Sequence, residues 1–334
     1  MKIHYFSGET WEEAFVRAKL PNEDITFYEK PFAEYPELSD PDATVLSIFM
    51  ESHIGEAELA RFPSLKLIAT RSTGFDHIDL AAAKAHGVTV VNVPSYGENT
   101  VAEFAFGLIL ALSRRIIEAD ERVRTTGLFS PNGLRGFDLA GKTLGVVGTG
   151  RIGQHIITMA NGFGMKVIGF DAYPNEERTK TLNFTYTSLP ELLAASDVIT
   201  IHVPYNADTH HLINRENIGS IKKGAYLVNT ARGAVIDTAA LIEALEKGEL
   251  AGAGLDVLED EGELNEEATL LTAPHPQEEK LRIALANNYL ITHPRVIVTP
   301  HVAFNTIEAV ERIIDTTIEN IQQFESGTPK NTIS

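Results

Sequence analysis

Short apolar runs alternate with helical patterns along the first hundred residues. The apolar runs predict strands at residues 2–6, 25–28, 44–49, 65–70 and 88–91. Apolar positions at helical spacing predict helices at residues 9–20, 57–62 and 78–86. Strands that are apolar throughout and separated by helices are typical of a parallel sheet covered on both faces. This segment is therefore expected to form an α/β unit of its own.

A longer helical pattern follows, from residue 100 to residue 124. Thr100 and Glu103 have the spacing of a capping box, in which a hydroxyl and a carboxylate each accept a hydrogen bond from an amide at the helix start. Val101, Leu108 and Leu112 fall on one apolar face of this helix. A long helix between two α/β units fits a hinge, a subunit contact or plain core packing, and the pattern does not decide between them.

A second alternation of strands and helices occupies the rest of the chain. Strands are predicted at residues 143–147, 166–170, 198–202, 225–229, 252–257 and 295–299, with helices at 152–162, 190–196 and 238–247. Ser188 and Glu191 have the spacing of another capping box. Residues 258–293, between the last two predicted strands, are irregular, acidic and partly helical. An amphipathic helix is predicted at residues 306–324.

Composition limits the classes of partner. A chain of 334 residues is longer than one hydrophobic core usually serves, so two domains are expected. A net charge of −18 disfavours nucleic acids and anionic membranes as partners. The absence of cysteine excludes disulfides and thiolate metal sites and fits a reducing compartment. The first residues do not resemble a signal peptide, and the apolar stretch 101–112 is too short to span a membrane, so a cytoplasmic protein is expected.

A glycine-rich loop follows the strand predicted at 143–147. Gly148 allows a tight turn, Gly150 allows the backbone to approach a pyrophosphate, and Gly153 allows close packing of helix and strand. The start of the next helix offers free amides and a positive dipole end. Asp171 ends the following strand, 18 residues after Gly153, where a carboxylate accepts hydrogen bonds from a ribose and repels a 2′-phosphate. This context predicts an NAD site and favours NAD over NADP.

Three later strands each end in a charged or titratable group. These groups are Arg232, the acidic cluster Glu259, Asp260 and Glu261, and His301. The carboxyl ends of strands in a doubly wound sheet gather at one crevice, so the three groups are expected to converge there. Considered one at a time, each of these groups could equally be an ordinary surface residue or a structural one. His210 and His211 are adjacent and no HExxH motif is present, so no metal site is expected.

Seven segments spread over nearly the whole chain together resemble the D-isomer-specific 2-hydroxyacid dehydrogenase family, and within it the D-lactate dehydrogenase branch. The segments are TRSTGFDHIDL (70–80), NVPSYGENTVAE (92–103), GVVGTGRIGQ (145–154), HVPYNADTHHLIN (202–214), LVNTARGAVID (227–237), GLDVLEDE (254–261) and TPHVAFNT (299–306). Their order along the chain is more specific than the glycine loop alone.

The resemblance assigns roles to residues of this chain. It implies that Arg232, Glu261 and His301 are catalytic, with Glu259 left open as an alternative to Glu261. The residues implied to bind substrate are Ser72, Thr73, Gly74, Tyr96 and Phe304. The residues implied to bind the cofactor are Thr100, Gly148, Gly150, Arg151, Ile152, Gly153, Asp171, Val203, Pro204, Thr230, Ala231 and Asp256.

The resemblance also implies an architecture and a reaction. Residues 99–301 are expected to form a Rossmann NAD-binding domain, inserted into a flavodoxin-like substrate domain made of residues 1–98 and 302–334. A homodimer is expected, with Ser72–Gly74 and Arg232 on opposite walls of a cleft between the domains. The implied reaction is reversible hydride transfer between NADH and a small 2-oxo acid, with pyruvate to D-lactate as the leading choice.

Other functions remain open at this point. Relatives within the same family act on glyoxylate, phosphoglycerate or branched-chain 2-oxo acids, and Phe304 argues against phosphoglycerate. A NAD-sensing binding protein, similar to the corepressors related to this family, keeps the same three groups. Asn305 leaves the preferred substrate side chain undecided.

Overall fold

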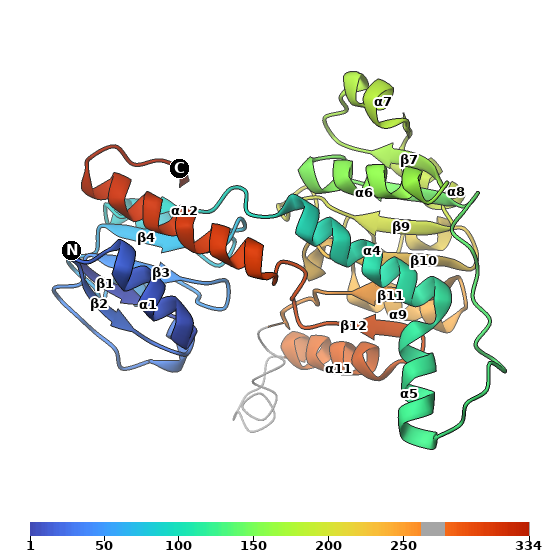
Figure 1. Ribbon diagram of the computed structural model, residues 1–334, viewed down its shortest axis with the longest axis horizontal. Helices are drawn as coiled ribbons and strands as arrows, with labels where there is room; N and C mark the ends of the chain where they lie inside the picture. The colour runs from blue at the N-terminus through green and yellow to red at the C-terminus, as the bar shows by residue number, and fades with distance from the viewer. Residues whose placement is uncertain (262–277, 334) are drawn as a thin grey trace. The chain divides into compact units, whose positions relative to one another are not determined.

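A computed structural model describes residues 1–261 and 278–333 (Figure 1). The chain forms two compact units. One consists of Met1–Gly97 with Asn305–Ser334, and the other of Glu98–Phe304. They are called unit 1 and unit 2 below. Of the helices in the described ranges, none is long and apolar enough to cross a membrane.

Unit 1 is built on a sheet whose five main strands are parallel. In spatial order the strands are β2 (Asp24–Phe27), β1 (Lys2–Tyr5), β3 (Val45–Ile48), β4 (Leu67–Thr70), β5 (Thr89–Val91) and β13 (Thr332–Ile333). The order 2-1-3-4-5 of the parallel strands is the flavodoxin-like arrangement, as predicted. The short strand β13 pairs antiparallel with β5 and was not predicted.

Helices cover both faces of the unit 1 sheet. Side chains alternate between faces along each strand, so Val45 points to one face and Leu46 to the other. One face packs against α1 (Thr10–Lys19) and α12 (Ile307–Glu325), the other against α2 (Glu56–Leu59), α3 (Leu80–Ala85) and the 3₁₀ turn η1 (Phe32–Glu34). This double coverage explains why the inner strands β3 and β4 are buried along their whole length.

Unit 2 contains a parallel sheet of seven strands. In spatial order they are β8 (Thr185–Tyr186), β7 (Lys166–Phe170), β6 (Thr143–Val147), β9 (Val198–Ile201), β10 (Ala225–Asn229), β11 (Leu250–Leu255) and β12 (Val296–Val298). Counted from β6, this is the Rossmann order 3-2-1-4-5-6, extended by one strand. The predicted fold class, two doubly wound parallel sheets, is confirmed. The order reverses between β6 and β9, where ligands bind in such sheets.

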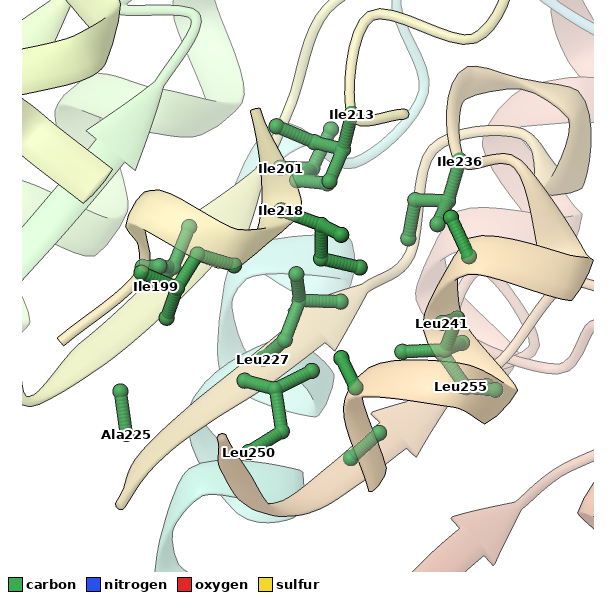
Figure 2. Packing of buried hydrophobic residues seen from close by; sticks show 14 of the residues in the cluster. Ile199, Ile201, Ile213, Ile218, Ala225, Leu227, Ile236, Leu241, Leu250 and Leu255 are labelled. Carbon is green, nitrogen blue, oxygen red and sulfur yellow. The ribbon is translucent and has the colours of Figure 1, made fainter. Parts of the chain in front are cut away.

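Both faces of this second sheet are also covered. On one face α4 (Glu98–Arg114) packs against β10 and β11, and α6 (Arg151–Gly162) packs against β6 and β7 (Figure 1). On the other face α8 (Leu189–Ala195), the 3₁₀ turn η2 (Ile218–Ser220) and α9 (Thr238–Glu246) enclose the cluster drawn in part in Figure 2, in which Leu255 lies beside Leu241. The remaining elements are α5 (Ile116–Thr126), α7 (Glu176–Leu182), the 3₁₀ turn η3 (Gly233–Val235) and α11 (Glu278–Thr292).

The prediction of one long helix at residues 100–124 is wrong in two respects. The helix begins at Glu98, so Thr100 lies inside its first turn and does not cap it, and the carboxylate of Glu103 accepts a hydrogen bond from Asn99 instead. The helix also breaks at Arg115, whose φ of 53° starts the separate helix α5. Hydrogen bonds from the Arg115 guanidinium to Glu118 and to the carbonyl of Gly133 hold this break.

Other local predictions have mixed outcomes. The capping box at Ser188 and Glu191 is confirmed. Helix α7 and strand β8 were not predicted, because both are short and exposed and show little apolar periodicity. The partly helical acidic segment yields α11, while its residues 262–277 lie outside the described residues.

Candidate active site

The glycine loop joins β6 to α6 and has an open side. Gly148 has a φ of +94°, and a Cβ added to it would lie 2.7 Å from the backbone of His202. A Cβ on Gly153 would lie 2.2 Å from the carbonyl oxygen of Gly148, so the close approach of helix and loop requires glycine. A Cβ on Gly150 would meet nothing within 4 Å. Open space beside Gly150, at the start of a twelve-residue helix, is what a backbone that approaches a pyrophosphate needs.

Asp171 follows β7 and is fixed to the rim of this loop. Its Oδ2 accepts hydrogen bonds from the backbone N–H and the hydroxyl of Thr149, at 2.8 and 3.0 Å. The Tyr186 hydroxyl lies 2.8 Å from the Thr149 hydroxyl, and Arg178 donates to the Thr149 carbonyl at 2.9 Å. Thr149 is the middle residue of the G-x-G turn, and of this network only Asp171 was identified from sequence. The network holds a carboxylate where a ribose would be recognised and a 2′-phosphate repelled.

Two buried polar atoms near the neighbouring strand ends have no hydrogen-bond partner among the described residues. One is Nδ1 of His202, after β9, and the other is the hydroxyl of Thr230, after β10. Burial lowers the pKa of His202 to about 3, so its ring is neutral near pH 7, and Nε2 lies 2.8 Å from the Thr200 hydroxyl. Buried polar atoms are almost always satisfied in proteins. These two atoms, next to Val203, Pro204 and Ala231, therefore fit the presence of a polar ligand such as NAD.

Arg232 lies in a tight turn at the end of β10. The side chain of Asn229 shapes this turn, because its oxygen accepts from the Ala231 N–H at 3.0 Å and its amide donates to the Arg232 carbonyl at 2.9 Å. Arg232 Nη1 donates to the Ala231 carbonyl at 2.8 Å. A Cβ added to Gly233 would lie 2.0 Å from the backbone of Leu258. Only glycine therefore lets the arginine turn pack directly on the acidic loop that follows β11.

His301 is held by two acids, one through its ring and one through its backbone. Its Nδ1 lies 2.5 Å from Oε1 of Glu261, and since a carboxylate only accepts, Nδ1–H donates and leaves Nε2 for chemistry. The carboxylate of Asp256, only 1% exposed, accepts from Thr299 and from the backbone N–H groups of residues 302 and 303. Burial raises the pKa of Asp256, and these hydrogen bonds oppose the rise. His301 has a φ of +52°, a strained conformation that this turn enforces.

The two glutamates of the acidic loop point to different partners. Glu261 contacts His301, whereas Glu259 contacts His211 and Thr238, each at 2.7 Å. The ring of Phe304 lies edge-on to His301, with 6.5 Å between the ring centres. In unit 2 the structure thus brings together Glu261, His301 and Phe304, with the arginine turn packed on the same acidic loop.

Four substrate-binding candidates lie in unit 1: Ser72, Thr73 and Gly74 follow β4, and Tyr96 follows β5. The Ser72 hydroxyl donates to the Gly74 carbonyl at 2.6 Å, and the Thr73 hydroxyl donates to the Val93 carbonyl at 2.8 Å. The Tyr96 carbonyl accepts from the Arg312 guanidinium. The two hydroxyls thus hold the loop in shape.

A Rossmann sheet with an open glycine loop at its first strand and an acid at the end of the second defines a dinucleotide-binding protein. Comparison with known proteins narrows this class. Residues 106–303 match the family model of the D-isomer-specific 2-hydroxyacid dehydrogenase NAD-binding domain. The chain belongs to the D-isomer-specific 2-hydroxyacid dehydrogenase family, and NAD is its cofactor.

Several relatives are similar over most of the chain. An aromatic 2-oxoacid reductase of Clostridium sporogenes is 42% identical over 80% of this chain and 78% of its own length. A D-lactate dehydrogenase of Treponema pallidum is 39% identical over 79% of this chain and 77% of its own length. The crystal structure of D-lactate dehydrogenase from Aquifex aeolicus with NAD and lactic acid has a TM-score of 0.86, with 37% identity, 98% coverage of this chain and 96% of that chain.

Proposed function

We propose that this chain reduces a small 2-oxo acid with NADH, reversibly and stereospecifically, to the D-2-hydroxy acid, with pyruvate to D-lactate as the preferred reaction. The observation that carries the proposal is the hydrogen bond between Glu261 and His301. Glu261 lies on the acidic loop against which the Arg232 turn packs, and His301 follows β12. A cation, a proton carrier and its carboxylate partner are the groups that a 2-oxo acid reduction requires.

The proposed cofactor site uses the carboxyl ends of the unit 2 strands. NAD supplies the hydride chemistry when bound. The glycine loop and the start of α6 would hold the pyrophosphate, and Asp171 the ribose. The residues proposed to line this site are Thr100, Gly148, Gly150, Arg151, Ile152, Gly153, Asp171, Val203, Pro204, Thr230, Ala231 and Asp256. Residues 99–301 are accordingly proposed as the NAD-binding domain, with residues 1–98 and 302–334 as the substrate domain.

Arg232 is proposed to bind the substrate carboxylate and polarise the carbonyl to be reduced. A planar guanidinium offers two parallel donors, which match a carboxylate better than the point charge of lysine. The backbone N–H groups of residues 72–74 are proposed as further donors to the carboxylate. Ser72, Thr73 and Gly74 suit this role because internal hydrogen bonds fix the loop.

His301 is proposed to move the proton. During reduction Nε2–H donates to the oxygen that gains negative charge, and in the reverse direction the neutral ring accepts the proton. Glu261 holds Nδ1–H, which fixes the ring and stabilises its cationic form. The turn held by Asp256 keeps the histidine in place during both directions.

The substrate side chain is the finer part of the proposal. Tyr96 and Phe304 are proposed to close around a small apolar group such as the methyl of pyruvate. The relatives divide on this point, since their names include an aromatic 2-oxoacid reductase and a D-lactate dehydrogenase. The matching solved structure with lactic acid supports the smaller substrate.

The test is steady-state turnover of NADH with pyruvate, phenylpyruvate, glyoxylate and 4-methyl-2-oxopentanoate, followed by chiral analysis of the products. We expect turnover with several of these acids, the highest kcat/KM with pyruvate, and only D products. A higher kcat/KM with another of these acids would replace pyruvate as the proposed substrate and leave the proposed reaction type unchanged. An L product, or NADH binding without turnover of any acid, would overturn the proposal and favour a NAD-sensing protein.

We further propose that the chain forms a homodimer through the region of α5. This helix has no buried residue, and the exposed apolar side chains gathered there are Ile116, Ile117, Val123, Leu128 and Phe129. Phe129 is 93% exposed, which is unusual for a large apolar side chain in a single subunit. A second copy of the chain is the occupant that covers such a patch symmetrically. Light scattering should give a dimer mass for the wild type and a lower mass for Phe129→Asp, and a monomeric wild type would refute this proposal.

A further inference from the structure

The chain reverses direction between the two glutamates of the acidic loop. Asp260 lies between them with a φ of +48°, a left-handed conformation. The turn directs Glu261 toward His301 and Glu259 toward the segment around His211. The side chain of Glu259 is only 11% exposed, so it is committed to its protein partners.

Glu259 joins two elements through its carboxylate. Its Oε1 accepts from Nε2–H of His211 at 2.7 Å, and its Oε2 accepts from the hydroxyl of Thr238 at 2.7 Å. Thr238 is the first residue of α9. The backbone carbonyl of Glu259 also accepts from the Asn287 side chain in α11, at 2.7 Å. The acidic loop is therefore tied to two helices and to the histidine segment.

The histidine segment in turn borders the Arg232 turn. The His211 N–H donates to the carbonyl of Ala234 at 2.8 Å. Ile213 forms a parallel bridge with Ile236, and both side chains enter the buried cluster drawn in Figure 2. A Cβ on Gly233 would lie 2.2 Å from the backbone N of Glu259. His211 and Glu259 thus clamp the segment that follows Arg232 from two sides.

We propose that Glu259 and His211 are a positioning pair, which fixes the Arg232 turn relative to the Glu261–His301 pair. This inference rests on the proposed function, because it gives these residues a task in the same reaction. Neither residue is assigned a contact with substrate or cofactor. Their effect is transmitted through the carbonyl of Ala234 and the packing of Gly233 against the acidic loop.

The clamp makes a specific kinetic prediction. A catalytic group that is misplaced by about 1 Å can cost on the order of 100-fold in rate. Loss of the clamp should shift the arginine that holds the oxo acid while leaving the glycine loop and the Glu261–His301 hydrogen bond intact. The KM for the oxo acid should therefore rise and kcat fall, while the NADH dissociation constant and the pH profile stay unchanged.

The experiment uses Glu259→Ala, His211→Ala and the double variant, with Glu259→Gln as the conservative change and Glu216→Gln as the matched control. Glu216 is an exposed acid in the same part of the chain. We expect kcat/KM for pyruvate to fall about tenfold or more in each alanine variant, by the misplacement argument. The double variant should lose little more than either single variant, because both remove one interaction. Glu259→Gln should retain part of the activity, since its amide oxygen still accepts from Thr238.

A second readout does not depend on turnover. Hydrogen exchange at the amides of residues 211–213 and 233–238 should be faster in Glu259→Ala and unchanged in Glu216→Gln. Should Glu259→Ala fail to fold, Glu259→Gln and His211→Gln replace the alanine variants, with smaller effects in the same direction.

Three results would overturn the inference. The alanine variants could show the same kinetics as Glu216→Gln, or they could lose kcat only in proportion to lost NADH-binding sites, with KM for pyruvate unchanged. The third is a pH profile that moves in Glu259→Gln. A wild type that turns over no 2-oxo acid would instead refute the proposed function, and unchanged hydrogen exchange would then refute the clamp separately.

Discussion

The two units share one architecture, but the loop after the first strand is closed in unit 1 and open in unit 2. In unit 1 a Cβ on Gly8 would lie 3.1 Å from the ring of Tyr5, and Arg71 donates to the carbonyls of Phe6 and Ser7. In unit 2 a Cβ on Gly150 would meet nothing within 4 Å. Topology provides the same crevice twice, and the side chains that fill it or leave it open decide where a nucleotide binds.

Arginines at strand ends repeat this contrast. Arg71, after β4, is 3% exposed and donates to Glu12 at 2.8 Å, and Glu12 also accepts from Tyr5. Arg232, after β10, is only half-buried, in a turn packed on the acidic loop. Unit 1 uses its arginine to stabilise its own core, whereas the arginine of unit 2 is the one proposed to bind the substrate.

The largest expected effect separates these two arginines. Arg232→Lys should leave the melting temperature and NADH affinity unchanged and lower kcat/KM for pyruvate by about 100- to 1,000-fold, as removal of an oriented charge donor does. Arg71→Met should instead lower the free energy of unfolding by about 3–5 kcal/mol, because it leaves Glu12 buried without its cation. Kinetics with thermal and denaturant unfolding measure both. If Arg232→Lys were destabilised and kept normal kinetics, the two arginines would not differ in role in this way.

The second effect tests the open loop. Gly150→Val should weaken NADH binding by about tenfold or more, since the side chain fills the space where the backbone approaches the pyrophosphate. The stability of the protein without cofactor should hardly change, because the new Cβ meets no protein atom. Gly8→Ala is the matched control, with slightly lower stability and normal NADH binding. Fluorescence titration with NADH gives the dissociation constants, and equal affinities in both variants would contradict the assignment of the open loop.

The smallest effect concerns the acid at the rim of the loop. Asp171→Ala should improve kcat/KM for NADPH by about tenfold, since it removes the repulsion between the carboxylate and the 2′-phosphate. A tenfold change corresponds to about 1.4 kcal/mol. Glu176→Ala, which removes an exposed acid from α7, should leave the ratio of NADH to NADPH activity unchanged. A wild type that already prefers NADPH would refute the role given to Asp171.

The sequence predicted what depends on apolar periodicity and failed where tertiary contacts decide. Both sheets were predicted because most of their strands are short apolar runs. The break at Arg115 depends on a hydrogen bond to the distant carbonyl of Gly133, which local spacing does not encode. Strand β13 is two residues long and exists only through its pairing with β5.

The candidate site shows the same limit. Motifs indicated Arg232, Glu261 and His301, but they left Glu259 as an alternative partner of the histidine. The left-handed turn at Asp260 separates the two glutamates, and it depends on contacts made by both sides of the loop. Thr149, which contacts both Asp171 and Tyr186, was not identified from sequence, because a residue between two loop glycines carries no distinctive pattern.

The most direct test of the proposed mechanism is the pH dependence of kcat/KM for pyruvate in the wild type, Glu261→Gln and Glu259→Gln. Reduction needs a protonated His301, so activity should fall as the pH rises and the histidine loses its proton, while lactate oxidation rises. The carboxylate of Glu261 stabilises the cation, so Glu261→Gln should move the pH of half-maximal reduction to lower values, and Glu259→Gln should leave it in place. A shift in neither variant, or in Glu259→Gln alone, would contradict the account.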